Sequence, residues 1–422
     1  MMLSLFTPTH NPQYLDRLAR SIARQTHTDF DWVIVPNGDA GEIQVDLPQA
    51  RIVPYAGQTQ NIGELKRFAC QACRGHVLVE VDHDDELTPD CLTELAAVFN
   101  DPNVDFAYSN TCEIHNGKPW KYDESFGWRY RPFTWDGQPQ LECIAFEPSP
   151  WSFSKIWFAP NHVRARRSSF YHRIGGHDSS RSVLDDHDLL CRSYIHGRVK
   201  HIDRCLYIYH VHPKNTCRGN QNAFIQTETL NIHDQYIYPL VERWCDLNSL
   251  RKIDLCGGLN PAETYQEMLT RTGNPLAVPS GSSYQPATRS YESVDLQNAH
   301  ITADLNQRWP FDDGEIGLIR AHDALEHLRH PLHTMQEAHR CLAPHGWLLT
   351  LTPSTDGRGA FQDPTHVSFW NSNSFWYYTR PEQAQFIHSP TLFEPNRIKN
   401  FCPSDWHREH QIVYVKADLL KS

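Results

Sequence analysis

The chain has 422 residues, of which 40% are hydrophobic and 21% are charged, and its formal net charge is −11. This length suggests two or three domains, and the apolar content argues against disorder. The acidic balance argues against broad electrostatic binding of nucleic acid, although it leaves a local basic stripe possible. The sequence has no membrane-spanning apolar run and no secretion leader, so we expect a cytoplasmic protein whose twelve cysteines are reduced.

The first hundred residues alternate between strand and helix patterns. Short apolar runs predict strands at residues 3–6, 32–35 and 76–81. Apolar residues at helical spacing predict helices between these strands, at residues 14–22 and 62–72. Strands separated by helices favour parallel pairing, so the pattern indicates an α/β fold.

Residues 110–160 are rich in Trp, Tyr, Phe and Pro, and we expect them to form a loop-bearing binding region rather than a core. Their aromatic rings are equally compatible with stacking on sugar rings and with ordinary packing. Regular patterning returns at residues 183–195, and a long helix is predicted at 222–244.

A second α/β pattern begins with a predicted strand at residues 251–255. Further strands are predicted at 293–296, 316–319 and 347–351, with a helix that begins at Pro331. We therefore predict two domains, 1–248 and 249–422, each large enough to bury its own core.

Three acidic residues, Asp82, Asp84 and Asp85, follow the strand predicted at 76–81. Ligands of parallel sheets bind beyond the carboxyl ends of the strands. Carboxylates in an Asp-x-Asp pattern there bind Mg²⁺ or Mn²⁺, which neutralises charge on a leaving diphosphate. A solvated acidic turn is the competing interpretation.

A second acidic cluster, Asp185-Asp186-His187-Asp188, precedes an apolar helical pattern. A carboxylate positioned there would act as a general base toward an attacking hydroxyl group. Aspartate is also favoured at helix N-termini through capping and the helix dipole. The two interpretations are compatible if Asp185 caps the helix and Asp186 is the base.

Five ordered blocks of the first 216 residues resemble family-2 glycosyltransferases of the GT-A fold, which use nucleotide-sugar donors. The blocks lie at residues 4–11, 21–38, 72–85, 184–189 and 209–216. The sequence departs from the family at Asp185, where the family has Glu, and around Asn37-Gly38-Asp39, where the family usually has an acidic pair.

The resemblance implies a role for particular residues. Those it places near the donor nucleotide are Thr7, Pro8, Asp39 and Asp82. Asp84 corresponds to the metal ligand, and His212 corresponds to a position that contacts the metal or the diphosphate. Asp186 corresponds to the general base, and a single base opposite the leaving group predicts inversion at the anomeric carbon.

Residues 251–378 resemble class I S-adenosylmethionine-dependent methyltransferases with a Rossmann-like sheet. The resemblance places Asp254, Gly257 and Gly258 in the cofactor-binding turn. It implies that Asp295 binds the ribose and that Asp304 lies on the adenine side. Because Gly257-Gly258 replaces the usual G-x-G, this domain is either an active methyltransferase or a scaffold without cofactor.

The second half also carries histidines at spacings that metal ligands can have. His327, His330 and His333 have helical spacing, but Pro331 breaks the helical face, so we interpret them as solvated side chains. His366 either binds or deprotonates a methyl acceptor or is simply packed in the core.

Together these patterns predict an enzyme that uses Mn²⁺ or Mg²⁺ and whose first domain moves a sugar from a nucleotide-diphosphate sugar to a glycan or another hydroxyl acceptor. Its second domain either methylates the glycan or acceptor with S-adenosylmethionine, which makes the protein bifunctional, or serves as a scaffold without cofactor. Two alternatives remain open: a glycosyltransferase acting on hydroxylated nucleic-acid bases, and a non-catalytic module that binds nucleotide sugars or glycans.

Overall fold

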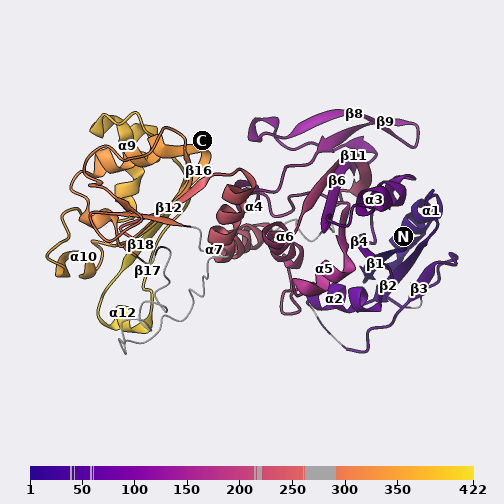
Figure 1. The fold of residues 1–422 in the computed structure, drawn as a ribbon. Coiled ribbons are helices and arrows are strands. Elements are labelled where there is room, and N and C mark those ends of the chain that lie inside the picture. Colours follow the sequence, from indigo (N-terminus) through magenta and orange to yellow (C-terminus); the bar gives the residue numbers. More distant parts are fainter. Residues whose placement is uncertain are drawn as a thin grey trace. The chain divides into compact units, whose positions relative to one another are not determined.

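The computed structural model describes residues 1–38, 40–41, 43–57, 59, 61–212, 215, 221–259, 261 and 291–422. The chain divides into two compact α/β units, Met1–Asp234 and Gln235–Ser422 (Figure 1). This division falls within the long helix α7 (Gln221–Leu247), and the boundary predicted from the sequence directly follows the end of that helix. The structure confirms the expected two-domain α/β fold.

The N-terminal unit is built on a mixed sheet with the strand order β3-β2-β1-β4-β10-β6-β11-β5. Its first strands pair in parallel, and β10 is antiparallel to both of its neighbours. The strands are β1 (Leu3–Thr9), β2 (Phe30–Pro36), β3 (Ala50–Ile52), β4 (Val77–Glu80), β5 (Glu86–Leu87), β6 (Phe106–His115), β7 (Lys118–Pro119), β8 (Arg129–Trp135), β9 (Gln138–Ile144), β10 (Arg164–Arg167) and β11 (Val199–His210).

Helices cover both faces of this sheet. The helices are α1 (Leu15–Ala23), α2 (Ile62–Ala72), α3 (Cys91–Phe99), α4 (Pro150–Lys155), α5 (Ser168–Arg173) and α6 (Asp185–His196). Apolar residues of α1 and α3 pack with Leu3 and Leu5 of β1, whereas α2, α5 and α6 pack with Phe6 of the same strand. This division follows from the alternation of side chains along a strand.

Strand β1 is longer than predicted, because it continues through Thr7-Pro8-Thr9. The register explains how a proline is accommodated in a strand between two others. Strand β4 pairs with β1 only as far as Phe6, while Pro8 faces Val35 on the β2 side alone. The missing N–H of Pro8 therefore interrupts no ladder on the β4 side.

The expectation of loops over residues 110–160 was wrong in part, since β6, β8 and β9 lie there. Strands β8 and β9 form an antiparallel hairpin around Asp136-Gly137, where both residues have positive φ. An Asp-Gly pair is a strong signal for such a two-residue turn. Several aromatic residues of this segment form a small cluster around Trp128.

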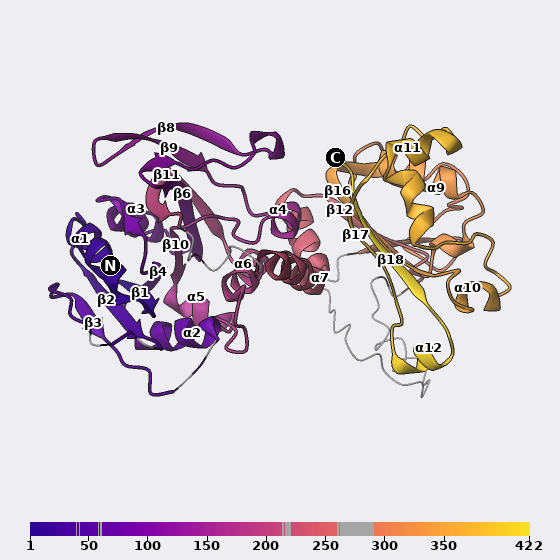
Figure 2. The same cartoon turned by 180° about the vertical axis from the view of Figure 1, so that it is seen from behind.

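The C-terminal unit has its own core and a sheet with the order β14-β13-β12-β15-β16-β18-β17. Figure 2 labels β12, β16, β17 and β18 of this sheet. The first five of these strands are parallel, and β18 is antiparallel to both neighbours. The strands are β12 (Arg251–Leu255), β13 (Glu292–Asp295), β14 (Ile301–Thr302), β15 (Ile316–His322), β16 (Leu342–Pro353), β17 (Glu394–Phe401) and β18 (Tyr414–Leu420).

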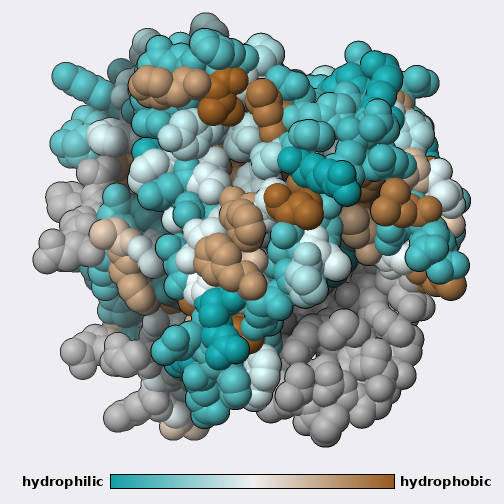
Figure 3. Space-filling model, turned by 90° about the vertical axis from the view of Figure 1, so that its left-hand side faces the viewer, coloured by the Kyte–Doolittle hydropathy of each residue, from teal (hydrophilic) through white to brown (hydrophobic). Residues whose placement is uncertain are grey.

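The order of the parallel strands is that of a doubly wound sheet. The chain adds β13 and β14 on one side of β12 and then adds β15 and β16 on the other side, so the strand order reverses between β12 and β15. Besides the end of α7, the described residues of this unit form the helices α9 (Pro331–Cys341), α10 (Gly359–Gln362), α11 (Pro381–Ala384) and α12 (Asp405–Glu409). Hydrophobic residues on the surface shown in Figure 3 occur as separate groups among hydrophilic ones. Among the described residues, no helix has the length and apolar character that a membrane crossing requires.

Candidate functional site

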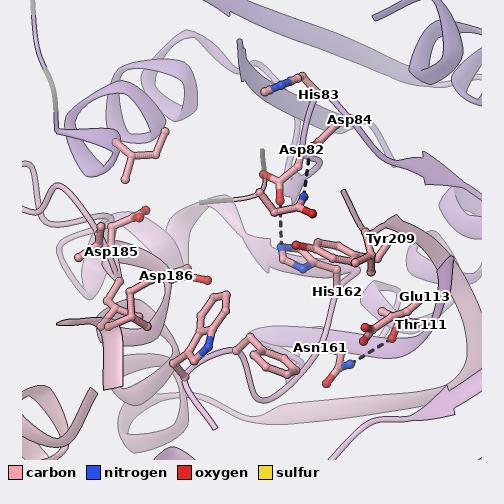
Figure 4. Close-up of a pocket in the computed structure, with 18 of the residues that line it drawn as sticks. Asp82, His83, Asp84, Thr111, Glu113, Asn161, His162, Asp185, Asp186 and Tyr209 are labelled. Atoms are coloured by element: carbon pink, nitrogen blue, oxygen red, sulfur yellow. Dashed lines mark hydrogen bonds and ion pairs between the residues drawn. The ribbon is translucent and has the colours of Figure 1, made fainter. Parts of the chain in front are cut away.

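A cavity of about 690 Å³ lies in the N-terminal unit, beyond the carboxyl ends of β1 and β4. The first turn of α6 and the segment between α4 and β10 form its other walls. Figure 4 shows Asp82, His83 and Asp84 on one side of the cavity and Asp185 and Asp186 on another. The sequence-predicted residues that line it are Pro8, Asp82, Asp84, Asp186 and His212.

Two predicted donor-binding residues do not join this group. Thr7 is fully buried, and its hydroxyl group donates to the carbonyl of Val81 at 2.8 Å and accepts from the Trp32 indole at 2.9 Å. The Thr7 side chain therefore links strands of the sheet rather than lining the cavity. Asp39 lies outside the described residues.

Asp84 and His212 form a tight pair of potential metal ligands. The Nε2 atom of His212 lies 2.8 Å from Oδ2 of Asp84, and both side chains are largely buried. The Tyr14 ring stacks on His212, and Asn215 accepts a hydrogen bond from the His212 backbone at 2.6 Å. Arg17 donates to the backbone carbonyl of Asp84, which fixes the loop.

The neighbouring carboxylates differ in their surroundings. The Asp85 side chain is fully buried and accepts from the Tyr207 hydroxyl group and the His210 backbone, each at 2.8 Å, so it holds the loop in place. Asp82 instead exposes 37% of its side chain toward the cavity. Partial desolvation at the floor of the cavity, with the Glu80 and Asp84 carboxylates nearby, raises the pKa of Asp82 to about 7.

This arrangement fits a divalent cation. Clustered carboxylates repel one another, and a bound cation would relieve that repulsion. Oxygen and imidazole ligands on one wall suit Mn²⁺ or Mg²⁺. Asp84 and His212 are the groups that would hold the ion, with Asp82 beside them.

Asp186 is held by a buried arginine. The Nη1 atom of Arg164 lies 2.6 Å from Oδ2 of Asp186, and Oδ1 accepts from the His187 backbone at 2.8 Å. Although burial opposes ionisation, Arg164 and Lys66 lower the pKa of Asp186 to about 2. The carboxylate is thus fixed in its ionised form at the start of α6.

Asp185 belongs to a second buried network. Lys66 of α2 lies 2.6 Å from Glu80 and 3.6 Å from Asp185, and all three side chains are almost inaccessible. Burial, together with Asp186 and Glu80, raises the pKa of Asp185 to about 7 in spite of Lys66. Two adjacent carboxylates therefore have opposite pKa shifts, an arrangement typical of acid–base sites.

The opposite side of the cavity combines aromatic rings with polar groups. Aromatic residues that line it are Trp120, Tyr122, Phe126, Trp128, Trp157 and Phe158. Glu113 lies among them, and burial raises its pKa to about 7. Asn161 donates to the Thr111 hydroxyl group at 3.0 Å, as Figure 4 shows. Flat apolar faces beside polar groups are suited to sugar rings.

Sequence reasoning missed several of these residues, namely Lys66, Glu113, His162 and Arg164. His162 faces Asp82 at 3.9 Å, and burial and Arg164 lower its pKa to about 3. Local pattern offered no usable signal for Arg164, because the basic run that forms β10 is typical of an exposed segment.

Of the residues predicted to bind the methyl donor, only some lie close to one another. The turn after β12 contacts β13, since Ser293 donates to the Gly258 carbonyl at 2.5 Å, and Asp295 ends β13. Gly258 has a φ of 55°, and a side chain at Gly257 would meet the Asp254 carboxylate at 2.6 Å.

Asp254 and Asp304 have structural partners. Asp254 is buried, and the guanidinium group of Arg320 contacts its two oxygens at 2.8 and 2.9 Å. Asp304 is exposed and accepts from the backbone and side chain of Asn306 at 2.9 and 3.0 Å. Asp254 therefore links β12 to β15 through Arg320, whereas Asp304 supports the local backbone.

Comparisons with known proteins agree with the two-part organisation. Residues 4–175 match the family model described as glycosyl transferase family 2, and residues 261–399 match one described as a methyltransferase domain. A chondroitin synthase of Escherichia coli is 23% identical over 229 residues, which cover 51% of this chain. The matched region spans only 30% of that protein.

Solved structures also align with the chain. TarS 1–349 of S. aureus in complex with UDP-GlcNAc has 14% identity and a TM-score of 0.42, and the alignment covers 58% of this chain and 73% of that one. GalNAc-T7 with UDP, GalNAc and Mn²⁺ has 11% identity and a TM-score of 0.39, with 56% and 50% covered.

Proposed function

Because the chain joins a family-2 glycosyltransferase domain to a methyltransferase-like domain, we propose that its N-terminal unit transfers a sugar from a nucleotide-diphosphate sugar to a hydroxyl acceptor. The observation that carries the proposal is that one cavity holds both a carboxylate suited to bind a cation and an ionised carboxylate suited to act as a base. The Asp84–His212 pair forms one wall. The ionised Asp186 lies across the cavity from Asp84 (Figure 4).

On the donor side, Pro8 and Asp82 are positioned to contact the nucleotide, and Asp84 and His212 would hold Mn²⁺ or Mg²⁺. A bound divalent cation would supply charge neutralisation for the departing diphosphate. The Tyr14 ring, which lines the cavity, stacks on the His212 ring and keeps it in a fixed orientation.

On the acceptor side, Asp186 accepts the proton of the attacking hydroxyl group. Arg164 keeps its carboxylate ionised and oriented, so that Oδ1 or Oδ2 is ready to receive the proton. Attack from this side, opposite the diphosphate, inverts the anomeric carbon. A positioned general base contributes typically about 10²–10⁴-fold to the rate.

A glycan is the acceptor that the aromatic wall favours. Aromatic rings stack on the apolar faces of sugars, and six such rings line this part of the cavity. The sequence similarity to a chondroitin synthase, whose name refers to a polysaccharide, points in the same direction. The net charge of −11 disfavours nucleic-acid bases as acceptors.

The direct test is sugar release from UDP-sugars, measured as transfer to water or to added oligosaccharides, with and without Mn²⁺. We expect activity only with metal, and a loss of roughly 10²–10⁴-fold in Asp186→Asn. Asp46→Asn is the matched control, because Asp46 is exposed and does not line the cavity. A chain that binds UDP with metal yet leaves every donor intact would instead be a non-catalytic binding module.

A second function is favoured by the turn after β12. We propose that the C-terminal unit binds S-adenosylmethionine, with Gly257 and Gly258 close to the ligand and Asp295 on its ribose. The support is the position of this turn at the carboxyl end of the sheet, beside the end of β13. Calorimetry with S-adenosylmethionine tests it: Asp295→Ala should weaken binding, and no binding to the unmodified chain would favour a scaffold role.

A further inference from the structure

Three potential metal ligands converge in the C-terminal unit, beyond the carboxyl end of β15. Glu326 and His327 lie in the short helix η3 (Leu325–His327), and His366 follows α10. One ligand atom from each of the three side chains lies within 4.8 Å of the other two. The sequence separates these groups by about 40 residues, so the fold creates the cluster.

Backbone hydrogen bonds fix the two segments to each other. The N–H groups of Val367 and Ser368 donate to the Glu326 carbonyl at 2.8 and 3.0 Å. The Ser368 hydroxyl group also donates to the Leu325 carbonyl at 2.8 Å. The positions of Glu326 and His366 are therefore set by the main chain rather than by the side chains themselves.

The ring contacts of both histidines suit metal binding. Nδ1 of His366 lies 3.0 Å from the Ala360 carbonyl, and Nδ1 of His327 lies 3.3 Å from the Thr365 carbonyl. A backbone carbonyl that accepts from Nδ1–H leaves Nε2 with its lone pair free for a cation. Both rings can thus be neutral and oriented ligands.

Glu326 supplies an independent observation. Glu326 is only 2% exposed, yet neither of its carboxylate oxygens has a hydrogen-bond partner among the described residues. Burying an ionised carboxylate without a partner is strongly unfavourable. A cation placed between Glu326 and the two imidazoles would satisfy this carboxylate.

The position in the fold also indicates a ligand. Strand β15, which precedes the cluster, pairs with β12 on one side and β16 on the other. The strand order reverses between β12 and β15, and open α/β sheets bind ligands beyond the carboxyl ends of strands at such a point. Glu326 and His327 follow the carboxyl end of β15 directly.

We propose that Glu326, His327 and His366 form a binding site for a divalent transition-metal ion. Two imidazoles and one carboxylate favour Mn²⁺, Fe²⁺, Co²⁺ or Zn²⁺ over Mg²⁺ and Ca²⁺, which prefer oxygen ligands. Three protein ligands leave further coordination positions for water or for oxygen atoms of a substrate. His327 is then a ligand and not the solvated side chain that the sequence suggested.

Cobalt titration of the full chain tests this site. The Asp84→Asn background weakens the cation site proposed for the sugar donor, so the remaining Co²⁺ reports on the C-terminal unit. After treatment with EDTA, we expect this variant to bind one Co²⁺ ion with visible absorption bands of a histidine-ligated ion. Adding Glu326→Gln or His366→Ala should lower the Co²⁺ affinity by roughly tenfold or more.

His330→Ala in the same background is the matched control, because His330 is an exposed histidine three residues beyond His327. It should leave the Co²⁺ affinity unchanged. If Glu326→Gln fails to fold by circular dichroism, the half-buried His366 still provides the test. The proposal would be overturned if Asp84→Asn formed no Co²⁺ complex, or if the variants with added Glu326→Gln, His366→Ala and His330→Ala all had the same Co²⁺ affinity. Neither result would bear on the measurements of sugar transfer.

Discussion

Asp185 and Asp186 are neighbours in the sequence, yet their surroundings shift their pKa values in opposite directions. Arg164 and Lys66 outweigh burial at Asp186 and lower its pKa to about 2, whereas burial raises that of Asp185 to about 7. A carboxylate that is always ionised is a weak but constantly available base, and one that titrates near neutrality is a stronger base in a smaller fraction of molecules. The two candidates therefore predict different pH dependence.

The first prediction concerns kcat/KM between about pH 5 and pH 9. With Asp186 as base, the group is deprotonated throughout this range, so it contributes no loss of rate on the acidic side. With Asp185 as base, protonation below its pKa of about 7 would lower the rate by about tenfold per pH unit. We therefore expect Asp185→Asn to leave the acidic side of the profile unchanged; an acidic limb that Asp185→Asn abolishes would make Asp185 the base.

The second prediction concerns the metal pair. Replacing His212 by Ala removes a ring whose Nε2 lies 2.8 Å from the Asp84 carboxylate. We expect Mn²⁺ to bind roughly 10–100-fold more weakly, as measured by the Mn²⁺ concentration that half-saturates sugar transfer. His76→Ala is the control, since His76 is exposed and distant from the cavity lining. An unchanged Mn²⁺ requirement in His212→Ala would remove His212 from the metal site.

At the scale of elements, local pattern predicted seven of the parallel strands, namely β1, β2, β4, β12, β13, β15 and β16. It predicted neither the parallel pair of β6 and β11 nor the buried strand β10. Apolar runs are visible in the sequence because parallel strands are buried on both faces. Strand β10 consists of Arg164-Ala165-Arg166-Arg167, a sequence that is typical of an exposed basic segment. It is buried only because Asp186 and Glu80 approach it from other elements, at 2.6 and 3.7 Å.

The same distinction applies to the candidate site. Pro8, Asp82, Asp84, Asp186 and His212 could be predicted because each stands in a block that resembles the family, and all five line one cavity. The groups that tune them were not predictable, because their burial and pairing depend on tertiary contacts. The Asp136-Gly137 hairpin, in contrast, carried a local turn signal that the loop assignment overlooked.

The third prediction tests how closely α2 must approach the start of α6. A side chain at Gly63 of α2 would lie 2.0 Å from the Asp178 carbonyl and 3.2 Å from Cβ of Asp185. Gly63→Ala should therefore displace α2 from the segment that contains Asp178 and precedes α6. We expect this change to cost about 1–3 kcal/mol of unfolding free energy and to lower sugar transfer. Gln71→Ala, an exposed change on the same helix, should alter neither. Full stability in Gly63→Ala would contradict this packing.

At the scale of the whole molecule, the two units have separate hydrophobic cores. One core gathers residues from Leu3 to Tyr207, and the other gathers residues from Ile253 to Leu419. Each unit is of a size that normally supports its own cooperative unfolding. Ligands of the two proposed sites should therefore stabilise different parts of the chain.

The fourth prediction is that calorimetry separates the two sites. UDP with Mn²⁺ and S-adenosylmethionine, each at about 100 times its Kd, should stabilise their own unit by roughly 2.7 kcal/mol, which raises its Tm by about 5–10 °C. Asp84→Asn should abolish the first shift and keep the second, and Asp295→Ala should do the reverse. Hydrogen exchange assigns each transition, because protection should increase in β1 and β4 with UDP and in β12 and β13 with S-adenosylmethionine. If both ligands protected the same strands, the assignment of one donor site to each unit would fail.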